Sequence, residues 1–375
     1  MVVVDWCLTS RALQSRASCA RLSVCDVPHD DAEIGPSSEL ADGLYIDSPW
    51  RAAQWQIQAG EAAPGTDCGT RVGHRLRYMD KRIDLFASVK QKTCMEKDRP
   101  SATAQGAAVV RTLHQILDDE PRILDDTIAA RLVREELERH KRMIRLFAPR
   151  GLRANLAMRS RYAEDCLAES LGDGVGQYVL LGAGLDTFAY RQPAWARSLR
   201  IFEVDHPATQ KWKRAKLAAA EISIPANVTL VPLDFERTSL KEGLAAGGLD
   251  FRIPTFFSSL GVTQYLTEEA LDLSLNFVLS LPPASEIVFS FVLAASALSW
   301  WERAFAAVFA VIVGVRGGEP WLSRFSPEQL ANKLTSMGFS KVIHFSTDAA
   351  NARYFRARRD GLKASKLEQM MRAIV

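Results

Sequence analysis

Short apolar runs alternate with longer stretches of helical period from residue 177 to the C-terminus. The runs have the length of buried strands, and we predict strands at 177–182, 200–205, 228–233, 254–260 and 285–292, with weaker candidates at 340–346 and 352–358. Helical patterns fill the gaps between them, at 207–221, 267–280 and 326–337. This alternation predicts an α/β fold, in which a doubly wound and mostly parallel sheet has helices on both faces.

Helical periodicity also precedes the first predicted strand. Ser101 stands at an N-cap position before apolar residues at helical spacing, so we predict a helix over 101–117. The Asp-Asp-Thr at 125–127 offers a cap for a second helical pattern at 128–144. A third pattern covers 153–171 and ends at Gly172. We therefore expect the sheet to carry N-terminal helical additions.

The first 95 residues show neither the helical nor the strand period over a useful length, and they hold five of the six cysteines. We predict that residues 1–95 form a poorly ordered or unassigned N-terminal segment and that residues 96–375 form the folded domain. An alternative is that translation of the native protein begins at Met79 or Met95.

Composition and charge argue against several kinds of partner. Hydrophobic residues make up 47% of the chain and charged residues 24%, which is ordinary for a globular protein. A net charge of +3 over 375 residues favours neither nucleic acid nor an anionic membrane. The densest internal basic cluster, residues 211–214, is predicted to be the solvated face of a helix rather than a phosphate-binding patch.

Membrane insertion, secretion and metal binding are also disfavoured. Glu302 and Arg303 divide the most apolar stretch, 287–315, into pieces too short to span a bilayer of about 30 Å. The cysteines form no Cys-x-x-Cys pair, and the histidines complete no metal-ligand spacing. The N-terminus lacks the basic lead-in of a secretory signal. We expect a cytoplasmic protein with reduced thiols and no bound metal.

Three predicted strands end in residues that suit a nucleoside ligand. The Gly-Ala-Gly at 182–184 follows the first strand, where missing side chains let the backbone bend sharply and approach a ligand. Asp205 ends the next strand, 23 residues after the first glycine, which is about the offset at which an acid meets a ribose hydroxyl. Asp234 ends the third strand and can accept from the exocyclic amine of adenine, while the backbone N–H of Phe235 can donate to the ring. Such strand ends meet at one crevice of an open α/β sheet.

Each of these features has a structural alternative. A Gly-x-Gly after a strand is more often a tight turn, and an acid at a strand end, such as Asp205 before Pro207, is commonly a helix N-cap. A dinucleotide fingerprint would have a third glycine where Thr187 stands, and Asp186 would repel a pyrophosphate. S-adenosylmethionine carries an ammonium and a sulfonium but no phosphate, so it is favoured over a nicotinamide cofactor.

Long, ordered motifs resemble the leucine carboxyl methyltransferase-like family, and in particular its bacterial branch of S-adenosyl-L-methionine-dependent methyltransferases. These motifs are QYVLLGAGLDTFAYR, FEVDHPATQKWKRAKL, FFSSLGVTQYLTEEA and GEPWLSRFSPEQLANKLTSMGF, together with PSATAQGAAVVRTLHQILDDEPRILDD and LRANLAMRSRYAED. The resemblance covers roughly residues 100–360. It implies a class I methyltransferase (Rossmann-like) fold, which is a seven-stranded sheet with an antiparallel last strand and added helices over the cofactor.

The resemblance also implies roles for individual residues. Arg159 in MRSRY would pair with the carboxylate of the cofactor, and Arg161 is a close rival for this role. Gly182 would contact the methionine part, Asp205 the ribose hydroxyls, and the Asp-Phe at 234–235 the adenine. The predicted cofactor-binding residues are Arg159, Gly182, Gly184, Asp205, Asp234 and Phe235.

We therefore predict an S-adenosylmethionine-dependent methyltransferase that methylates an oxygen of a small-molecule acceptor, either a carboxylate or a hydroxyl. Phosphatase-directed members of the family carry a glutamate where this chain has Leu260, which counts against activity on a phosphatase tail. The alternatives are a nicotinamide-dependent oxidoreductase and a non-catalytic cofactor-binding protein. No catalytic residue is assigned, because His206 is more readily a helix cap than a base, and Tyr265 fits core packing as well as an acceptor pocket.

Overall fold

The structure is a computed structural model that describes residues 101–138, 149–234, 238–300, 302–304, 306–307, 310 and 321–375. All of them belong to one compact unit of the chain, Gly73–Val375. The predicted N-terminal segment 1–95 lies outside the described residues.

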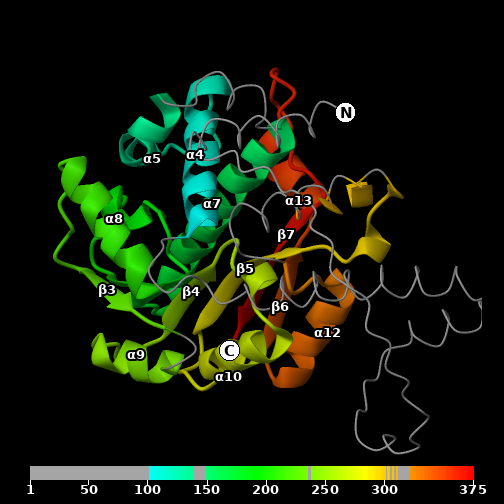
Figure 1. Cartoon of the computed structure of the whole chain (residues 1–375). Helices are drawn as coiled ribbons and strands as arrows, with labels where there is room; N and C mark the ends of the chain where they lie inside the picture. The colour runs from blue at the N-terminus through cyan, green and yellow to red at the C-terminus, as the bar shows by residue number, and fades with distance from the viewer. Residues whose placement is uncertain are drawn as a thin grey trace, which may run out of the picture. The chain divides into compact units, whose positions relative to one another are not determined.

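One seven-stranded sheet forms the centre of the described part of the chain (Figure 1). Its strands are Gln177–Leu181 (β1), Arg200–Asp205 (β2), Val228–Pro232 (β3), Thr255–Ser259 (β4), Glu286–Val292 (β5), Lys341–Phe345 (β6) and Glu368–Ile374 (β7). Their order is β3-β2-β1-β4-β5-β7-β6, with β1 to β5 paired in parallel and β7 antiparallel to both β5 and β6. The predicted doubly wound sheet with an antiparallel last strand is confirmed.

The seventh strand is not where the sequence pattern placed it. The predicted strand at 352–358 is wrong, because this part of the chain continues from α13 (Thr347–Ala350) into the π-helical turn Asn351–Phe355. The seventh strand is β7 instead, and the pattern missed it because β7 carries charged residues into the core. Nε of Arg372 on β7 lies 2.7 Å from Oε2 of Glu286 on β5, so the buried charges neutralise each other.

The predicted N-terminal helices are present, with their caps. Oγ of Ser101 accepts a hydrogen bond from the N–H of Ala104 at 3.1 Å, and Oδ1 of Asp126 accepts one from the N–H of Ala129 at 2.9 Å. The second helix ends earlier than predicted, with a turn at Val133 before helical residues 134–138, and 139–148 lie outside the described residues. Among the described residues, the helices before β1 are α4 (Ala102–Leu117), α5 (Thr127–Leu132) and α7 (Arg150–Ser170).

Helices cover both faces of the sheet, and a hydrophobic cluster lies on each face (Figure 1). The side chains of β1 alternate between the clusters, with Leu180 in one and Val179 in the other. The first cluster includes residues of α7 and α13. The second includes residues of three helices after β3, namely α9 (Leu240–Ala246), α10 (Glu268–Leu279) and α12 (Pro327–Met337). Burial on both faces explains why β1, β4 and β5 show no regular alternation of apolar and polar residues.

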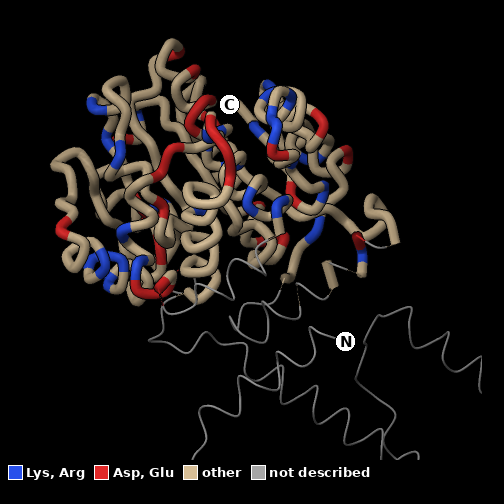
Figure 2. Tube along the Cα trace, turned by 90° about the horizontal axis from the view of Figure 1, so that it is seen from above, with Lys and Arg blue, Asp and Glu red and all other residues tan. Residues whose placement is uncertain are grey.

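Basic and acidic positions are interspersed along the described chain (Figure 2). The basic cluster at 211–214 lies on α8 (Pro207–Ala219), where Lys211 and Arg214 are exposed as predicted. Lys213 differs from the prediction, because its ammonium is buried and lies 2.7 Å from Oε2 of Glu203 on β2. The cluster is therefore partly a buried ion pair that attaches α8 to the sheet.

Candidate active site

One cavity of about 1240 Å³ lies beyond the carboxyl ends of the parallel strands. It spans the switch point of the sheet, where the chain order reverses between β1 and β4. Its walls come from α4 and α7, from the segments that follow β1 to β4, and from the segment that leads into β7. The cavity is larger than the usual range of about 300–1,000 Å³ for a site that holds one ligand.

Five of the six predicted cofactor-binding residues line this cavity: Arg159, Gly182, Gly184, Asp205 and Asp234. The sixth, Phe235, lies outside the described residues. Arg161 is not among the lining residues. Its Nε is 2.7 Å from Oδ1 of Asp165, and its side chain is 48% exposed. Arg159 is thus the arginine of MRSRY that faces the cavity, while its role toward the cofactor stays a prediction.

The loop after β1 needs its glycines for structural reasons alone. Gly182 has a φ of +66° and Gly184 a φ of +45°, which are left-handed conformations that favour glycine. A Cβ atom on Gly182 would lie 2.4 Å from Cγ2 of Val262, and one on Gly184 would lie 3.0 Å from Cβ of Ala104. The tight turn also leaves the backbone of both glycines in the wall of the cavity.

Asp205 holds the end of β2 against this loop. Its Oδ2 accepts from the N–H of Gly184 at 2.5 Å, and its Oδ1 accepts from the N–H of His206 at 2.7 Å. Burial raises the pKa of the Asp205 carboxyl, and the two backbone N–H groups only partly oppose this rise. The alternative that Asp205 is the N-cap of α8 is wrong, because His206 takes that role and its Nδ1 accepts from the N–H of Ala208 at 3.3 Å.

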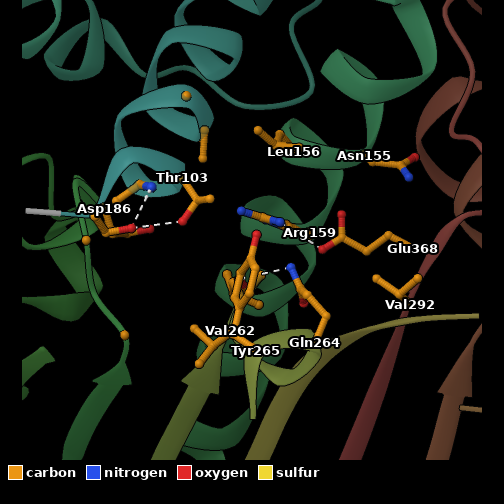
Figure 3. Close-up of a pocket in the computed structure, with 18 of the residues that line it drawn as sticks. Thr103, Asn155, Leu156, Arg159, Asp186, Val262, Gln264, Tyr265, Val292 and Glu368 are labelled. Carbon is orange, nitrogen blue, oxygen red and sulfur yellow. Dashed lines mark hydrogen bonds and ion pairs between the residues drawn. The ribbon is translucent and has the colours of Figure 1, made fainter. Parts of the chain in front are cut away.

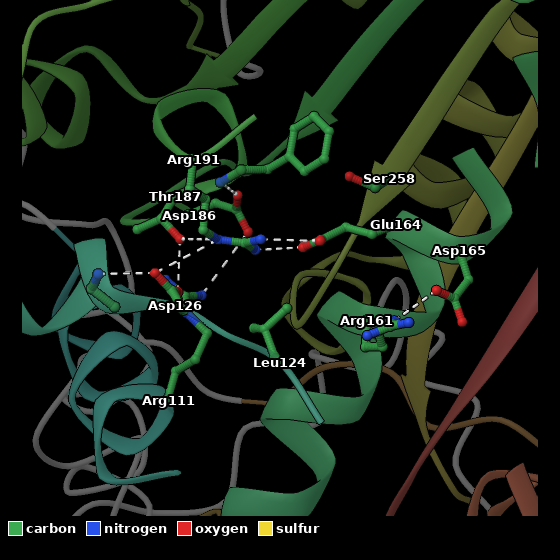
Figure 4. A network of polar contacts seen from close by, with 12 residues as sticks. Arg111, Leu124, Asp126, Arg161, Glu164, Asp165, Asp186, Thr187, Arg191 and Ser258 are labelled. Carbon is green, nitrogen blue, oxygen red and sulfur yellow. Dashed lines mark hydrogen bonds and ion pairs between the residues drawn. The ribbon is translucent and has the colours of Figure 1, made fainter. Parts of the chain in front are cut away.

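A buried ionic network contacts the loop after β1 (Figure 4). Nε of Arg111 on α4 lies 2.8 Å from Oδ2 of Asp126, and its Nη2 donates to the carbonyl of Leu185 at 2.6 Å. Nη1 of Arg111 also lies 4.0 Å from Oδ2 of Asp186, a residue that lines the cavity. Thr187 donates to Oδ2 of Asp126 at 2.7 Å, so the residue in place of a third glycine has a hydrogen-bonding role here.

Arg191 extends the network to α7. It pairs with Glu164 and its Nε lies 3.7 Å from Oδ1 of Asp126. Burial alone would raise the pKa of the Asp126 carboxyl, but the guanidinium groups of Arg111 and Arg191 hold it below its ordinary value. For Glu164 burial prevails, and its pKa is raised. No sequence pattern indicates this network, because its members are up to 80 residues apart in the chain.

Arg159 forms an ion pair inside the cavity that is separate from this network (Figure 3). Its Nη1 lies 2.8 Å from Oε1 of Glu368 on β7, and both residues line the cavity. A Cβ atom on Gly261 would lie 2.6 Å from Nη1 of Arg159, so this glycine leaves room for the guanidinium. Tyr265 also lines the cavity, from the 3₁₀ turn Thr263–Tyr265. Glu368 and Val262 were not predicted: Glu368 lies outside the quoted motifs, and Val262 stands in FFSSLGVTQYLTEEA but was given no role.

The structure adds two negative findings for the residues it describes. Within those residues, every helix is either too short or too polar to cross a membrane. The described histidine, cysteine, aspartate and glutamate side chains form no group of three or more that could hold a metal ion. The cytoplasmic location stays a prediction.

Known proteins are similar to this chain in sequence. Residues 104–279 match the leucine carboxyl methyltransferase family. A Bacillus subtilis protein, "Putative S-adenosyl-L-methionine-dependent methyltransferase YktD", is 34% identical over 312 residues, which cover 75% of this chain and 99% of that protein. A Streptomyces coelicolor protein with the same kind of name is 32% identical over 187 residues, 46% of this chain and 62% of its own.

Among solved structures, a methyltransferase described as putative from Thermobifida fusca YX is 16% identical, with a TM-score of 0.45, over 74% of this chain and 96% of its own. The long match to the Bacillus subtilis protein extends over nearly all of that relative. The chain therefore belongs to the leucine carboxyl methyltransferase family of S-adenosyl-L-methionine-dependent methyltransferases.

Proposed function

We propose that this methyltransferase transfers the methyl group to an oxygen of a small-molecule acceptor, either a carboxylate or a hydroxyl. The observation that supports this is the cavity of about 1240 Å³, which has room for an acceptor beside the cofactor. Away from the glycine loop its lining is largely apolar, and it includes Leu156, Val292 and the ring of Tyr265 (Figure 3).

The residues of the cavity suit S-adenosylmethionine. In this proposal Gly182 and Gly184 approach the methionine part, Asp205 accepts from the ribose hydroxyls, and Asp234 with Phe235 holds the adenine. The carboxylates of Asp186, Asp205 and Asp234 in the lining favour a cofactor with an ammonium and a sulfonium, and they would repel a pyrophosphate.

The bound cofactor supplies a methyl group on a sulfonium, which is a good leaving group. The protein then has to align the acceptor oxygen with the methyl group and exclude water. A carboxylate acceptor needs no base, whereas a hydroxyl must lose a proton. His206 is a poor candidate for that base, because its Nδ1 caps α8.

A small-molecule acceptor is preferred over a protein tail for one reason in the sequence. Leu260 lines the cavity at the position where phosphatase-directed members carry a glutamate.

We also propose that the methyltransferase domain comprises residues 96–375 and that the protein is cytoplasmic.

Calorimetric titration of the full chain with S-adenosylmethionine, S-adenosylhomocysteine and NADH tests the cofactor site. We expect micromolar binding of the adenosyl ligands, and a loss of about 10-fold or more in Asp205→Ala and Asp234→Ala, since each removes a charged hydrogen-bond acceptor. Asp348→Ala, an exposed aspartate on α13, is the matched control and should bind normally. Tight binding of NADH without the adenosyl ligands would contradict the proposal.

The acceptor atom is tested with methyl-labelled cofactor and separate panels of carboxylic acids and of alcohols and phenols. Mild alkali releases the label from a methyl ester as methanol but leaves it on a methyl ether. If the labelled methyl group is found bonded only to nitrogen or carbon in the products, oxygen is not the acceptor atom.

A further inference from the structure

We propose that Glu368 binds the α-ammonium of the cofactor, so that Glu368 and Arg159 together recognise its amino-acid end. This inference depends on the proposed cofactor site. The amino-acid end of S-adenosylmethionine is a zwitterion, in which an ammonium and a carboxylate share one carbon atom. The Arg159–Glu368 pair is its charge complement, with a guanidinium and a carboxylate 2.8 Å apart in the cavity wall.

Glu368 has an oxygen available for this contact. Its Oε1 is occupied by Nη1 of Arg159. Its Oε2 has no hydrogen-bond partner among the described residues and is not sealed in the core. Figure 3 shows the carboxylate with one oxygen toward Arg159 and the other turned away from it. The residue as a whole is only 9% exposed, so an ammonium at Oε2 would be bound in a largely desolvated place.

The arrangement also satisfies the charges before the cofactor binds. Arg159 and Glu368 neutralise each other in the free protein, with side chains 12% and 11% exposed, so neither is an uncompensated buried charge. The amino-acid end of the cofactor would place its carboxylate beside the guanidinium of Arg159 and its ammonium beside the carboxylate of Glu368. Each of the four charges then lies beside a charge of opposite sign. Gly261 makes this possible, because any larger residue would push the guanidinium away.

Asp186 is the rival partner for the ammonium. It lines the same cavity, but its Oδ1 accepts from the N–H of Phe188 at 2.8 Å and its Oδ2 lies 4.0 Å from Nη1 of Arg111. Both of its oxygens therefore already face a donor or a cation. Glu368 has an open oxygen and Asp186 does not, and this difference favours Glu368.

Three ligands separate the contributions of the two charged groups. S-adenosylhomocysteine has both the ammonium and the carboxylate, S-adenosyl-3-thiopropylamine has the ammonium alone, and 5′-methylthioadenosine has neither. For Glu368→Gln we expect the affinity for the first two ligands to fall by about 10-fold or more, with 5′-methylthioadenosine unchanged. For Arg159→Gln we expect a loss for S-adenosylhomocysteine only. Asp348→Asn, at an exposed position on α13, is the matched control and should bind all three ligands normally. Asp186→Asn tests the rival partner, and its loss of affinity for the thiopropylamine should be smaller than that of Glu368→Gln.

Other outcomes overturn the inference. A loss in Glu368→Gln that is confined to S-adenosylhomocysteine would show that Glu368 acts only through Arg159. A loss of thiopropylamine binding in Asp186→Asn but not in Glu368→Gln would assign the ammonium to Asp186. Because Glu368→Gln leaves Arg159 unpaired, the doubly substituted Arg159→Gln/Glu368→Gln protein is measured as well, and it should lose both charged ligands and keep 5′-methylthioadenosine. Equal losses of affinity for all three ligands in the Glu368→Gln protein and in the doubly substituted protein would also count against the inference. If the unsubstituted chain binds none of the ligands, the cofactor site itself is wrong.

Discussion

Oδ2 of Asp205 accepts a hydrogen bond from the backbone N–H of Gly184 at 2.5 Å, and this bond joins the end of β2 to the loop that follows β1. The carboxylate thereby helps to build the turn whose backbone lines the cavity. The group proposed to hold the ribose is thus also part of the structure that shapes the cofactor site, so its ionisation should affect ligand binding directly.

Binding of S-adenosylhomocysteine should weaken in acid because of Asp205. Burial raises the pKa of this carboxyl above the ordinary 3.8, so in the free protein it takes up a proton at a higher pH than an ordinary aspartic acid. The protonated form accepts fewer hydrogen bonds, and the affinity should fall as the pH drops through that raised pKa. Calorimetry from about pH 8 down to the lowest pH at which the protein stays folded measures this.

Asp205→Asn is the control for this pH dependence. It should bind about 10-fold more weakly at neutral pH and should lack the acid-dependent fall. Parallel pH curves of affinity for the two proteins would show that another group titrates.

The effect of Asp205 on stability has the opposite pH dependence to its effect on binding. Because its pKa is raised, Asp205 contributes most to folding below pH 3.8, and that contribution is lost as the pH rises through its pKa in the folded protein.

Gly182→Ala should lower both stability and ligand affinity. The new Cβ would lie 2.4 Å from Cγ2 of Val262, and the φ of +66° is strained for alanine. We expect a loss of about 1–3 kcal/mol in the free energy of unfolding, measured by urea denaturation. In a protein that also carries Val262→Ala, the same glycine substitution should cost less, because only the backbone strain remains. An equal cost in both backgrounds would rule out the contact with Val262 as its cause.

Three of the strands that were predicted correctly share a simple physical origin. β1, β4 and β5 are buried on both faces, so each is a short run without regular alternation of apolar and polar residues, and it can be predicted without knowledge of its neighbours. β7 could not be predicted in this way, because its charge at Arg372 is tolerated only through Glu286, which is 86 residues away in the chain. Phe355, in the region wrongly predicted as a strand, packs into the core from a helical turn.

The same distinction holds for the site. That Gly182, Asp205 and Asp234 line one cavity could be predicted from the sequence, because the carboxyl ends of parallel strands meet at one edge of the sheet. The place of Arg159 in the same cavity was indicated only by resemblance to a family. The place of Glu368 could not be predicted, since its contact with Arg159 spans 209 residues of chain.

Asp126→Asn should strongly destabilise the fold. The carboxylate is fully buried and accepts from Arg111 at 2.8 Å and from Thr187 at 2.7 Å, so its loss leaves a buried guanidinium without its partner. We expect a decrease of about 3–5 kcal/mol in the free energy of unfolding. Because the pKa of Asp126 is lowered, its contribution is present above pH 3.8 and is lost as the pH falls through the lower pKa of the folded protein.

Urea denaturation of both proteins at several pH values checks the magnitude and the sign. The gap between the two unfolding free energies should narrow on acidification below pH 3.8. Asp348→Asn, at an exposed position, should show little change at any pH. A gap that widens in acid would mean that Asp126 is not held ionised by its arginine neighbours.

Tyr178 and Ser258 should behave as a coupled pair. The hydroxyl of Tyr178 on β1 lies 2.8 Å from Oγ of Ser258 on β4, and the two residues are 2% and 3% exposed. Burial raises the pKa of the Tyr178 phenol well above its ordinary value, so the group stays a neutral hydrogen-bonding partner. Tyr178→Phe should lower the free energy of unfolding by about 1–3 kcal/mol, because it leaves the buried Ser258 hydroxyl unsatisfied.

Ser258→Ala should then lower the free energy of unfolding less in the Tyr178→Phe protein than in the unsubstituted one. A double-mutant cycle of urea unfolding measures the coupling, and costs that add to within about 0.5 kcal/mol would show that the hydrogen bond contributes nothing to stability.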